Sequence, residues 1–429
     1  MSKFNEFTKV TAMAGLATMA LASCASSGKA QKDNNASQIT RTDNMEEIDN
    51  NFLVLSDSQR DAIAKGNDFA MNLFRKQVGM DSKVVSPLSV AYLMGMLANG
   101  ANGNTQAEIM KTLGMDGVSL QTLNETYKAV MNMAGRYDRQ TAINIANCMA
   151  VNKNVSLKEG FRNAMTDLYS ANVESMDFGS GSTLKHINDW CSTQTKGMIP
   201  KIIDQLDANA TSVIMNAIYF NGTWKSKFDK KDTNVEAFRG YTRDIKRVPM
   251  MHQNAKFYYT TTNDYAAVNL PYGNGTYSMT VILPNEGKSV SETMASLDAK
   301  KFAEIGNSMD QCIVDLKLPR FSIETSTQLN KPLSELGAPS IFNPGAADFS
   351  NISSTPMFVS AMLQKAKIEV SETGTKAAAV TAGIMLMSAL PDKEPRHVQF
   401  YANRPFIYAI TERNSGAIYF IGEYTGYEE

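Results

Sequence analysis

The stretch S-E-T-G-T-K-A-A-A-V-T-A-G-I-M-L-M-S-A-L, residues 371–390, lies close to the C-terminus of the 429-residue chain. It carries charge only near its start and contains no proline, whereas loops of this length are usually rich in Pro, Asp, Asn and charge. When extended, it places the small odd-numbered residues from Thr375 to Thr381 on one face and Lys376 on the other. The pattern predicts a strand that can enter a packed sheet. A Gly/Ala-rich surface loop is the alternative that composition leaves open.

The composition of the rest of the chain excludes several functions. The 42 Lys and Arg residues balance 43 Asp and Glu residues, so no basic surface for nucleic acid or a membrane is indicated. The three His residues, at positions 186, 252 and 397, are far apart and lack the spacing of metal ligands or of a Ser-His-Asp triad. We therefore predict no catalytic residues, no metal and no cofactor.

The chain has four Cys residues, and none forms a CxxC pair. Cys24 belongs to the N-terminal export pattern described below, so an odd number of Cys residues, three, remains for the folded part. A disulfide framework is therefore not expected. Cys148 and Cys312 lie in apolar runs, which predicts buried thiols.

Residues 1–23 have the pattern of an export signal, with Lys3 and Lys9 before a short apolar segment. The apolar segment is too short to span a membrane comfortably. It ends in L-A-S-C, which resembles a bacterial lipobox and predicts that Cys24 is lipidated. An ordinary signal peptide with an incidental Cys is the alternative.

Residues 24–54 are rich in Ser, Asn, Asp, Lys and Gln and have too little apolar surface to pack, so they are predicted to form a flexible tether. Residues 55–429 would then form the globular part. We expect an exported protein that is anchored in a bacterial envelope, with membrane contact through the lipid alone.

The globular part begins with clear helix signals. Residues 66–78 have apolar residues at helical spacing. Ser86 is a good N-cap before Pro87, and the apolar residues that follow predict a buried helix. Thr105 and Glu108 have the spacing of a capping box for the next helix. Residues 213–228 predict a buried strand followed by a Gly turn.

The hinge E-T-G-T-K-A-A-A, preceded by K-A-K-I-E-V and followed by F-Y-A-N-R-P-F, resembles the reactive-centre loop of the serpins. Further motifs occur in the family's order over residues 55–427, including N-A-I-Y-F-N-G-T-W, L-P-Y-G, M-T-V-I-L-P-N and L-K-L-P-R-F. The resemblance implies one α+β domain with the serpin fold, in which three β-sheets and eight or nine helices carry an exposed reactive-centre loop.

The resemblance also implies roles for residues around the main sheet. Ser86 and Ser89 would lie beneath its centre, and Trp224 would pack at its top, where the loop enters. Many serpins have a His in an H-K-A motif beneath the sheet, whereas this chain has Gln364. That side chain can donate to and accept from Ser86 and Asn216 but cannot titrate.

The activity implied by the resemblance is suicide inhibition of a protease by a monomeric protein. The target would cleave the loop, form an acyl-ester through its Ser or Cys, and remain covalently held when the hinge half of the loop inserts into the main sheet. Insertion would begin only after cleavage, with Thr375 entering first. The hinge begins at Glu372, and Gly374 gives the pivot its backbone freedom. The residues that follow are small: Thr375, Ala377, Ala378 and Ala379.

Counting from Glu372 as in the family places the scissile bond at Ser388–Ala389, flanked by Leu386, Met387 and Leu390. These small or apolar residues suit elastase-like or subtilisin-like serine proteases, and papain-like Cys proteases are a further target class. The segment after the bond is longer than usual, so the exact bond within residues 386–390 stays open.

Two other functions compete with inhibition. A serpin-fold protein that binds ligands or acts like a chaperone would carry charge, proline or bulk in the hinge, and this hinge has none. An anchored enzyme or solute-binding lipoprotein would need a nucleophile motif, a phosphate loop or metal-ligand spacing, and the sequence contains none of these.

Overall fold

The computed structural model describes residues 54–134, 136–242, 244–375 and 394–427. The predicted signal, Cys24, the tether and most of the predicted loop therefore lie outside the described residues. Within them the chain alternates helices and strands, and nine α-helices are present. No helix in this part is long and apolar enough to cross a membrane.

The helices are α1 (Asp57–Arg75), α2 (Pro87–Gly100), α3 (Gly103–Thr112), α4 (Leu120–Met133), α5 (Glu159–Tyr169), α6 (Gly181–Gln194), α7 (Val290–Ser296), α8 (Ala299–Asn307) and α9 (Asn330–Glu335). Two short 3-10 helices span Lys230–Asp232 and Pro339–Phe342.

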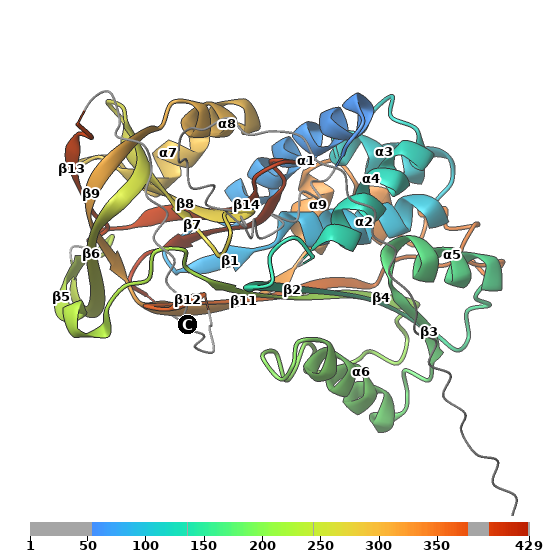
Figure 1. Cartoon of the computed structure of the whole chain (residues 1–429). Helices are drawn as coiled ribbons and strands as arrows, with labels where there is room; N and C mark the ends of the chain where they lie inside the picture. The colour runs from blue at the N-terminus through green and yellow to red at the C-terminus, as the bar shows by residue number, and fades with distance from the viewer. Residues whose placement is uncertain (1–53, 135, 243, 376–393, 428–429) are drawn as a thin grey trace, which may run out of the picture. The chain divides into compact units, whose positions relative to one another are not determined.

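The main sheet has six strands in the order β10-β11-β12-β4-β2-β3. Their bounds are β2 (Thr141–Asn152), β3 (Asn172–Met176), β4 (Ser212–Thr223), β10 (Phe321–Gln328), β11 (Ala361–Ser371) and β12 (Gly374–Thr375). Figure 1 shows α2, α4 and α5 on one face of this sheet and α6 on the opposite face. Because both faces are covered, β4 is buried almost throughout, which explains its continuous apolar sequence.

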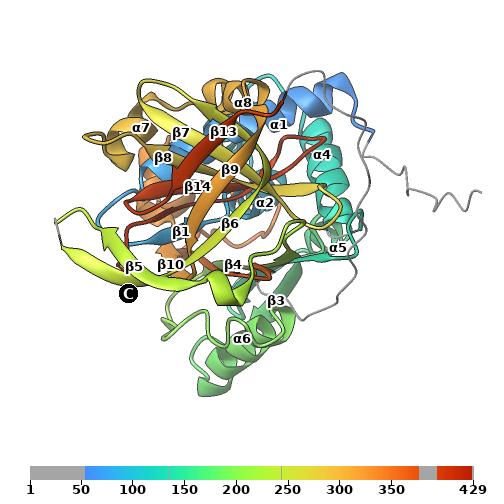
Figure 2. The same cartoon turned by 60° about the vertical axis from the view of Figure 1, so that its left-hand side comes forward.

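A second sheet has nine strands, of which eight follow the order β1-β15-β14-β8-β7-β6-β9-β13, while β5 pairs with β6. The bounds are β1 (Lys83–Val85), β5 (Asn234–Arg239), β6 (Ile245–Thr261), β7 (Tyr265–Pro271), β8 (Tyr277–Pro284), β9 (Asp310–Pro319), β13 (His397–Tyr401), β14 (Phe406–Glu412) and β15 (Ile418–Tyr424). The long β6 pairs with β5 through its first part, with β9 from Met250 to Tyr259 and with β7 at its end, so it joins two strand sets (Figure 2). These sets and the main sheet correspond to the three sheets that the resemblance implies.

The start of α2 confirms the local prediction, whereas the start of α3 does not. Ser86 caps α2 and Pro87 occupies its first turn. The N-cap of α3 is Asn102, so the predicted capping box of Thr105 and Glu108 is wrong. Both side chains make tertiary contacts instead. The Thr105 hydroxyl accepts a hydrogen bond from the backbone N–H of Asp348 at 3.0 Å, and the Glu108 carboxylate accepts one from the backbone N–H of Ser340 at 3.0 Å.

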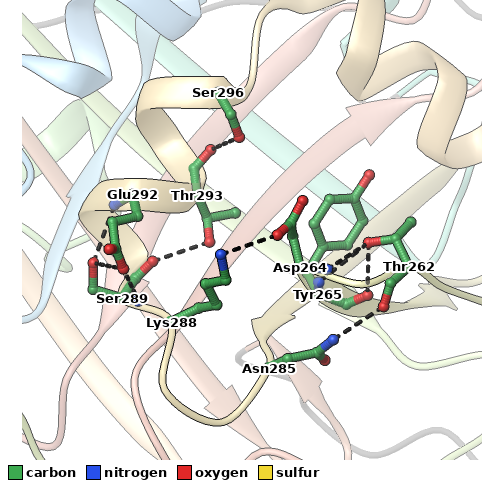
Figure 3. A network of polar contacts seen from close by, with 9 residues as sticks. All are labelled: Thr262, Asp264, Tyr265, Asn285, Lys288, Ser289, Glu292, Thr293 and Ser296. Atoms are coloured by element: carbon green, nitrogen blue, oxygen red, sulfur yellow. Dashed lines mark hydrogen bonds and ion pairs between the residues drawn. The ribbon is translucent and has the colours of Figure 1, made fainter.

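Polar contacts fasten α7 to the turn between β6 and β7 (Figure 3). Ser289 and Glu292 form a capping box at the start of α7. Just before it, Lys288 pairs with Asp264 at 3.3 Å, and Asn285 donates to the Thr262 carbonyl oxygen at 3.0 Å. The connection from β8 to α7 is thereby held against the neighbouring turn.

Glu423 on β15 is fully buried. Its Oε1 accepts from the Gly79 backbone at 2.7 Å, and its Oε2 has no hydrogen-bond partner among the described residues. Burial raises the pKa of this carboxyl from 4.5 to about 7. Since the folded state favours the protonated form, this group stabilises the fold fully below pH 4.5, and its contribution is lost as pH rises through 7.

We therefore expect Glu423→Gln to remove a pH-dependent loss of about 3 kcal/mol in the free energy of unfolding between pH 4.5 and pH 8. The amide keeps an oxygen for Gly79 and cannot ionise. Urea unfolding of both proteins at pH 5 and pH 8 measures the effect: relative to the parent, the variant gains stability at the higher pH. An equal difference at both pH values would show that Glu423 is not the titrating group.

Candidate functional site

The centre of the main sheet contains a seam between two parallel strands. β11 and β4 pair directly from Ala361 opposite Val213 to Lys367 opposite Tyr219. Beyond that point β12 lies between them, with Thr375 pairing with both β11 and β4. The first residues of the hinge are thus already seated in the intact chain, a difference from the sequence-based expectation that Thr375 enters only after cleavage.

Glycine is the residue type that fits at position 374, between β11 and β4. Its φ of +143° is a conformation that other residues rarely adopt, and a Cβ atom would lie 2.1 Å from the carbonyl oxygen of Gly222. Gly222 is itself constrained, because a Cβ there would lie 2.9 Å from the ring of Tyr272. Gly374 therefore allows the hinge backbone to approach β4, and Gly222 leaves room for the ring of Tyr272.

Thr375 is fully buried against two stacked rings. Its hydroxyl lies 2.7 Å from that of Tyr272, whose ring stacks on Trp224 with centroids 4.3 Å apart. The indole of Trp224 donates to the Ser371 carbonyl oxygen at 2.9 Å, and its backbone N–H donates to that of Thr373 at 3.0 Å. Trp224 thus lies at the point where the hinge meets the sheet. Tyr272 was missed, although it lies in the L-P-Y-G motif.

Glu372 anchors the start of the hinge from inside the protein. The residue is 3% exposed. Its Oε1 accepts from the Thr233 hydroxyl at 3.0 Å and from Arg320 Nη1 at 3.4 Å, and its carbonyl oxygen accepts from the backbone of Phe228 at 2.9 Å. Sequence reasoning missed Thr233 and Arg320, because no local pattern marks residues 139 and 52 positions away as partners.

A buried polar cluster ties the seam together below the hinge. Gln364 on β11 accepts from the Ser86 N–H at 2.9 Å and donates to the Ser86 carbonyl oxygen at 2.8 Å and to Asn216 Oδ1 at 3.3 Å. Ser86 also donates through its hydroxyl to Ser89 at 3.0 Å, and Asn216 donates to Asn147 at 2.9 Å. The cluster links α2 to β11, β4 and β2, so the strands that border the seam are fixed by the same contacts.

We expect Gln364→Leu to lower the free energy of unfolding by about 1–3 kcal/mol, since it leaves the N–H of the fully buried Ser86 without its acceptor and removes one of the two donors to the Ser86 carbonyl oxygen. Urea denaturation measures the loss. Gln328→Leu, on the exposed face of β10, is the matched control and should change stability little. Equal effects in the two variants would contradict the importance of the cluster.

The other end of the loop is anchored by β13, which pairs in parallel with β9. Tyr401 on β13 donates to Asp315, whose other carboxylate oxygen lies 2.6 Å from His252 Nε2. The hydrogen bond to Asp315 raises the pKa of Tyr401 to about 12. Burial opposes ionisation of Asp315, but the contacts with Tyr401 and His252 lower its pKa. Side chains from β13, β9 and β6 therefore meet in one polar contact at the end of β13.

The described cysteines, Cys148, Cys191 and Cys312, are buried free thiols, which confirms the prediction for Cys148 and Cys312. Burial raises the pKa of Cys191 to about 12. In the described ranges no three His, Cys, Asp or Glu side chains are grouped as a metal site would need. Several predicted residues lie outside the described ranges: Cys24, Ala377, Ala378, Ala379, Leu386, Met387, Ser388, Ala389 and Leu390.

The fold is that of an α+β protein whose main sheet holds the residues of β12 between two strands, above the point where these strands pair directly. Comparisons with known proteins agree with this description. A family model described as "Serpin (serine protease inhibitor)" matches residues 64–426. The chain belongs to the serpin family.

Similar sequences include protease inhibitors from vertebrates. The chain is 32% identical to leukocyte elastase inhibitor A of Rattus norvegicus over 350 residues, which cover 79% of this chain and 91% of the relative. It is 33% identical to plasminogen activator inhibitor 1 of Sus scrofa over 372 residues, which cover 83% of this chain and 90% of the relative.

Solved structures of serpins have the same fold. The native state of the thermophilic serpin tengpin matches with a TM-score of 0.79 and 29% identity, over 87% of this chain and 95% of that one. Native protease nexin-1 with heparin matches with a TM-score of 0.76 and 26% identity, over 86% of this chain and 99% of that one.

Proposed function

We propose that this chain inhibits a serine protease by trapping it as a covalent acyl-enzyme. The observation that carries the proposal is the position of β12. A hinge in which Gly374 and Thr375 already pair with β11 and β4, next to the point where these two strands pair directly, is set to continue as a new strand. Membership of a family of serine protease inhibitors supports the same activity.

The chemical step uses the target's own nucleophile. Its serine oxygen attacks the carbonyl carbon of Ser388, the peptide bond to Ala389 breaks, and the new amine leaves with a proton. An ester then joins the protease to Ser388. Insertion of the released hinge half gives the sheet a strand with hydrogen bonds on both edges, and it moves the attached protease before water can hydrolyse the ester.

The register of β12 defines how the new strand would lie. Thr375 pairs with Val370 on β11 and Gly222 on β4. Continuing this antiparallel register places Thr381 beside Gln364 and Asn216, in the buried polar cluster. The inserted strand would therefore bring a hydroxyl, which can donate and accept, to the polar centre of the seam.

The same register separates inward from outward residues. Ala379 would lie beside Ala366 and Ile218, which are buried. Ala378 would lie beside Lys367 on the outer face. We expect Ala379→Asp to abolish covalent trapping, because an isolated carboxylate would be buried, and Ala378→Asp to retain it. The yield of covalent complex on a denaturing gel compares the pair. Equal yields would show that the strand does not insert in this register.

The residues before and at the proposed bond, Leu386, Met387 and Ser388, suit shallow apolar binding pockets. We therefore propose elastase-like or subtilisin-like serine proteases as targets, with papain-like Cys proteases as the second class. The similarity to a leukocyte elastase inhibitor supports the first choice.

The test mixes the purified protein with an elastase-like protease and separates the products on a denaturing gel. A band at the summed mass that resists boiling supports the proposal, and mass spectrometry of the released peptide identifies the bond. Cleavage near Ser388 with full protease activity left would make the chain a substrate of that enzyme. Such an outcome with both serine protease classes would favour a binding or chaperone-like serpin instead.

We also propose that the protein is exported and lipid-anchored in a bacterial envelope through Cys24, after removal of residues 1–23. The polar residues 24–54 would separate the lipid from the folded part. Incorporation of a labelled fatty acid that is lost in Cys24→Ser would support this anchoring. Equal labelling of the two proteins would contradict it.

A further inference from the structure

An open hollow of ≈ 640 Å³ lies beside the main sheet, at the end away from the hinge. One side is formed by the start of β11 and the end of β10, including Leu363 and Gln328. The other side is the connection between α6 and β4, residues 195–211, which contributes Ile202, Ile203 and Leu206. The volume is in the range of small-molecule sites.

Contacts with two elements hold the connection in place. Asn188 on α6 accepts from the Ile202 N–H at 2.8 Å and donates to the Ile203 carbonyl oxygen at 2.9 Å. Lys365 on β11 donates to the Lys201 carbonyl oxygen at 2.8 Å. The hollow therefore has a defined shape before a ligand enters, and a preformed site lowers the entropy cost of binding.

The charge of the lining is negative. Asp204 and Asp207 line the hollow, and no Lys, Arg or His does so among the described residues. Asp204 pairs with Lys201 at 2.5 Å, but its side chain is 86% exposed, so this pair is weak. One oxygen of Asp207 accepts from the backbone N–H of Asn209 at 2.9 Å. Both carboxylates can therefore turn to a cation in the hollow.

We propose that this hollow binds a small amine with an apolar body. The side chains of Leu206 and Leu363 are half-buried and would cover the body, because removing apolar surface from water is favourable. The ammonium group would lie beside Asp204 and Asp207, and the exposed side-chain amide of Gln328 can accept from it as well. An anion of the same shape would meet two like charges.

The two sides of the hollow belong to opposite sides of the seam. The connection leads into β4, whereas Leu363 and Gln328 lie on β11 and β10. Insertion of a strand between β11 and β4, which rests on the proposed function, would move these sides apart by one strand spacing, about 4.8 Å. A ligand that contacts both sides therefore binds the intact chain more tightly than the inserted one.

Three indole compounds of similar size test the class of ligand. Tryptamine, tryptophol and indole-3-propionate carry an ammonium group, a hydroxyl group and a carboxylate, respectively. Calorimetry with the intact protein at low ionic strength measures their affinities. We expect saturable binding that is tightest for tryptamine and weakest for indole-3-propionate. Equal affinities for the three compounds, or no binding of tryptamine, would overturn the proposed class of ligand.

Variants locate the site. The double variant Asp204→Asn, Asp207→Asn should bind tryptamine about three- to tenfold more weakly and tryptophol unchanged, because exposed carboxylates contribute modestly to binding. Asp57→Asn, Asp61→Asn on α1 removes the same charge away from the hollow and is the matched control. Ala361→Trp, which fills part of the hollow, should weaken the binding of both compounds.

Equal losses of tryptamine affinity in the two double variants would show general charge attraction and overturn the site. Unchanged binding by a folded Ala361→Trp protein would place the ligand elsewhere. None of these measurements requires a protease, so they are independent of whether the chain inhibits one.

Cleavage by a metalloprotease within residues 376–393 tests the coupling to insertion, since the attacking group is water and no acyl-enzyme forms. A rise in the thermal midpoint of the cleaved protein reports insertion, because the new strand adds hydrogen bonds. We then expect tryptamine to bind at least about fivefold more weakly. Unchanged affinity in the inserted protein would overturn the coupling. Cleavage without a gain in stability would contradict insertion, and the coupling with it, while the site in the intact chain would stand.

Discussion

Thr375→Arg is expected to turn the chain from an inhibitor into a substrate, with at least about a tenfold rise in the molecules consumed per protease inhibited. Thr375 is fully buried between β11 and β4, and its hydroxyl lies 2.7 Å from that of Tyr272. An arginine in this place would bring an unpaired charge into the sheet. The hinge would then insert slowly, and water would hydrolyse the acyl-ester first.

The native fold should survive this change. β12 contributes only two residues to the sheet, and the direct pairing of β11 with β4 does not depend on it. The covalent complex on a denaturing gel and the stoichiometry of inhibition measure the effect. Thr375→Ser, which keeps the hydroxyl for Tyr272, is the matched control and should trap normally. Full trapping by Thr375→Arg would refute insertion from this position.

Glu372→Lys is expected to have the largest effect on the folded state, with a fall of about 3–5 kcal/mol in the free energy of unfolding. The carboxylate is 4% exposed and accepts from Thr233 and Arg320. A lysine would place a second cation beside Arg320 and leave the Thr233 hydroxyl without its acceptor. The hinge would lose its anchor, and the strand edges at the top of the seam would be free.

Free strand edges can pair with a strand from another molecule. We therefore expect Glu372→Lys to form oligomers on mild heating at temperatures where the parent remains monomeric. Size-exclusion chromatography after heating and urea unfolding provide the measurements. Glu369→Lys, which changes a partly exposed residue of β11 shortly before Glu372, is the control. Oligomers in equal amounts from both variants would argue against a specific role for Glu372.

Much of the fold could be predicted from local pattern. Ser86 before Pro87 and the continuous apolar run after them indicated the buried helix α2, and the apolar run of β4 indicated a buried strand. The predicted capping box of Thr105 and Glu108 does not form, because both side chains make tertiary contacts instead. A helix cap depends on the side chains of a few adjacent residues. A stronger contact between one of these side chains and a distant segment can therefore replace it.

The candidate site was predicted in part. Trp224 and Gln364 were placed by their motifs, and the contacts of Gln364 with Ser86 and Asn216 follow from its ability to donate and accept. The amide, unlike a histidine, gives this cluster no titrating group. The partners of Glu372 were not predicted, since Thr233 and Arg320 have no spacing or motif that connects them with the hinge.

The sequence by itself determined the elements, the family resemblance and a hinge of small residues with a glycine pivot, because these depend on residue type and local spacing. Only the tertiary structure decided that the hinge is already seated in the intact chain. That seat depends on Tyr272, 103 residues from Thr375, and on the backbone of Gly222, whose carbonyl oxygen leaves no room for a Cβ atom on Gly374. Such contacts arise when distant segments pack together, and a single sequence does not encode the distance between them.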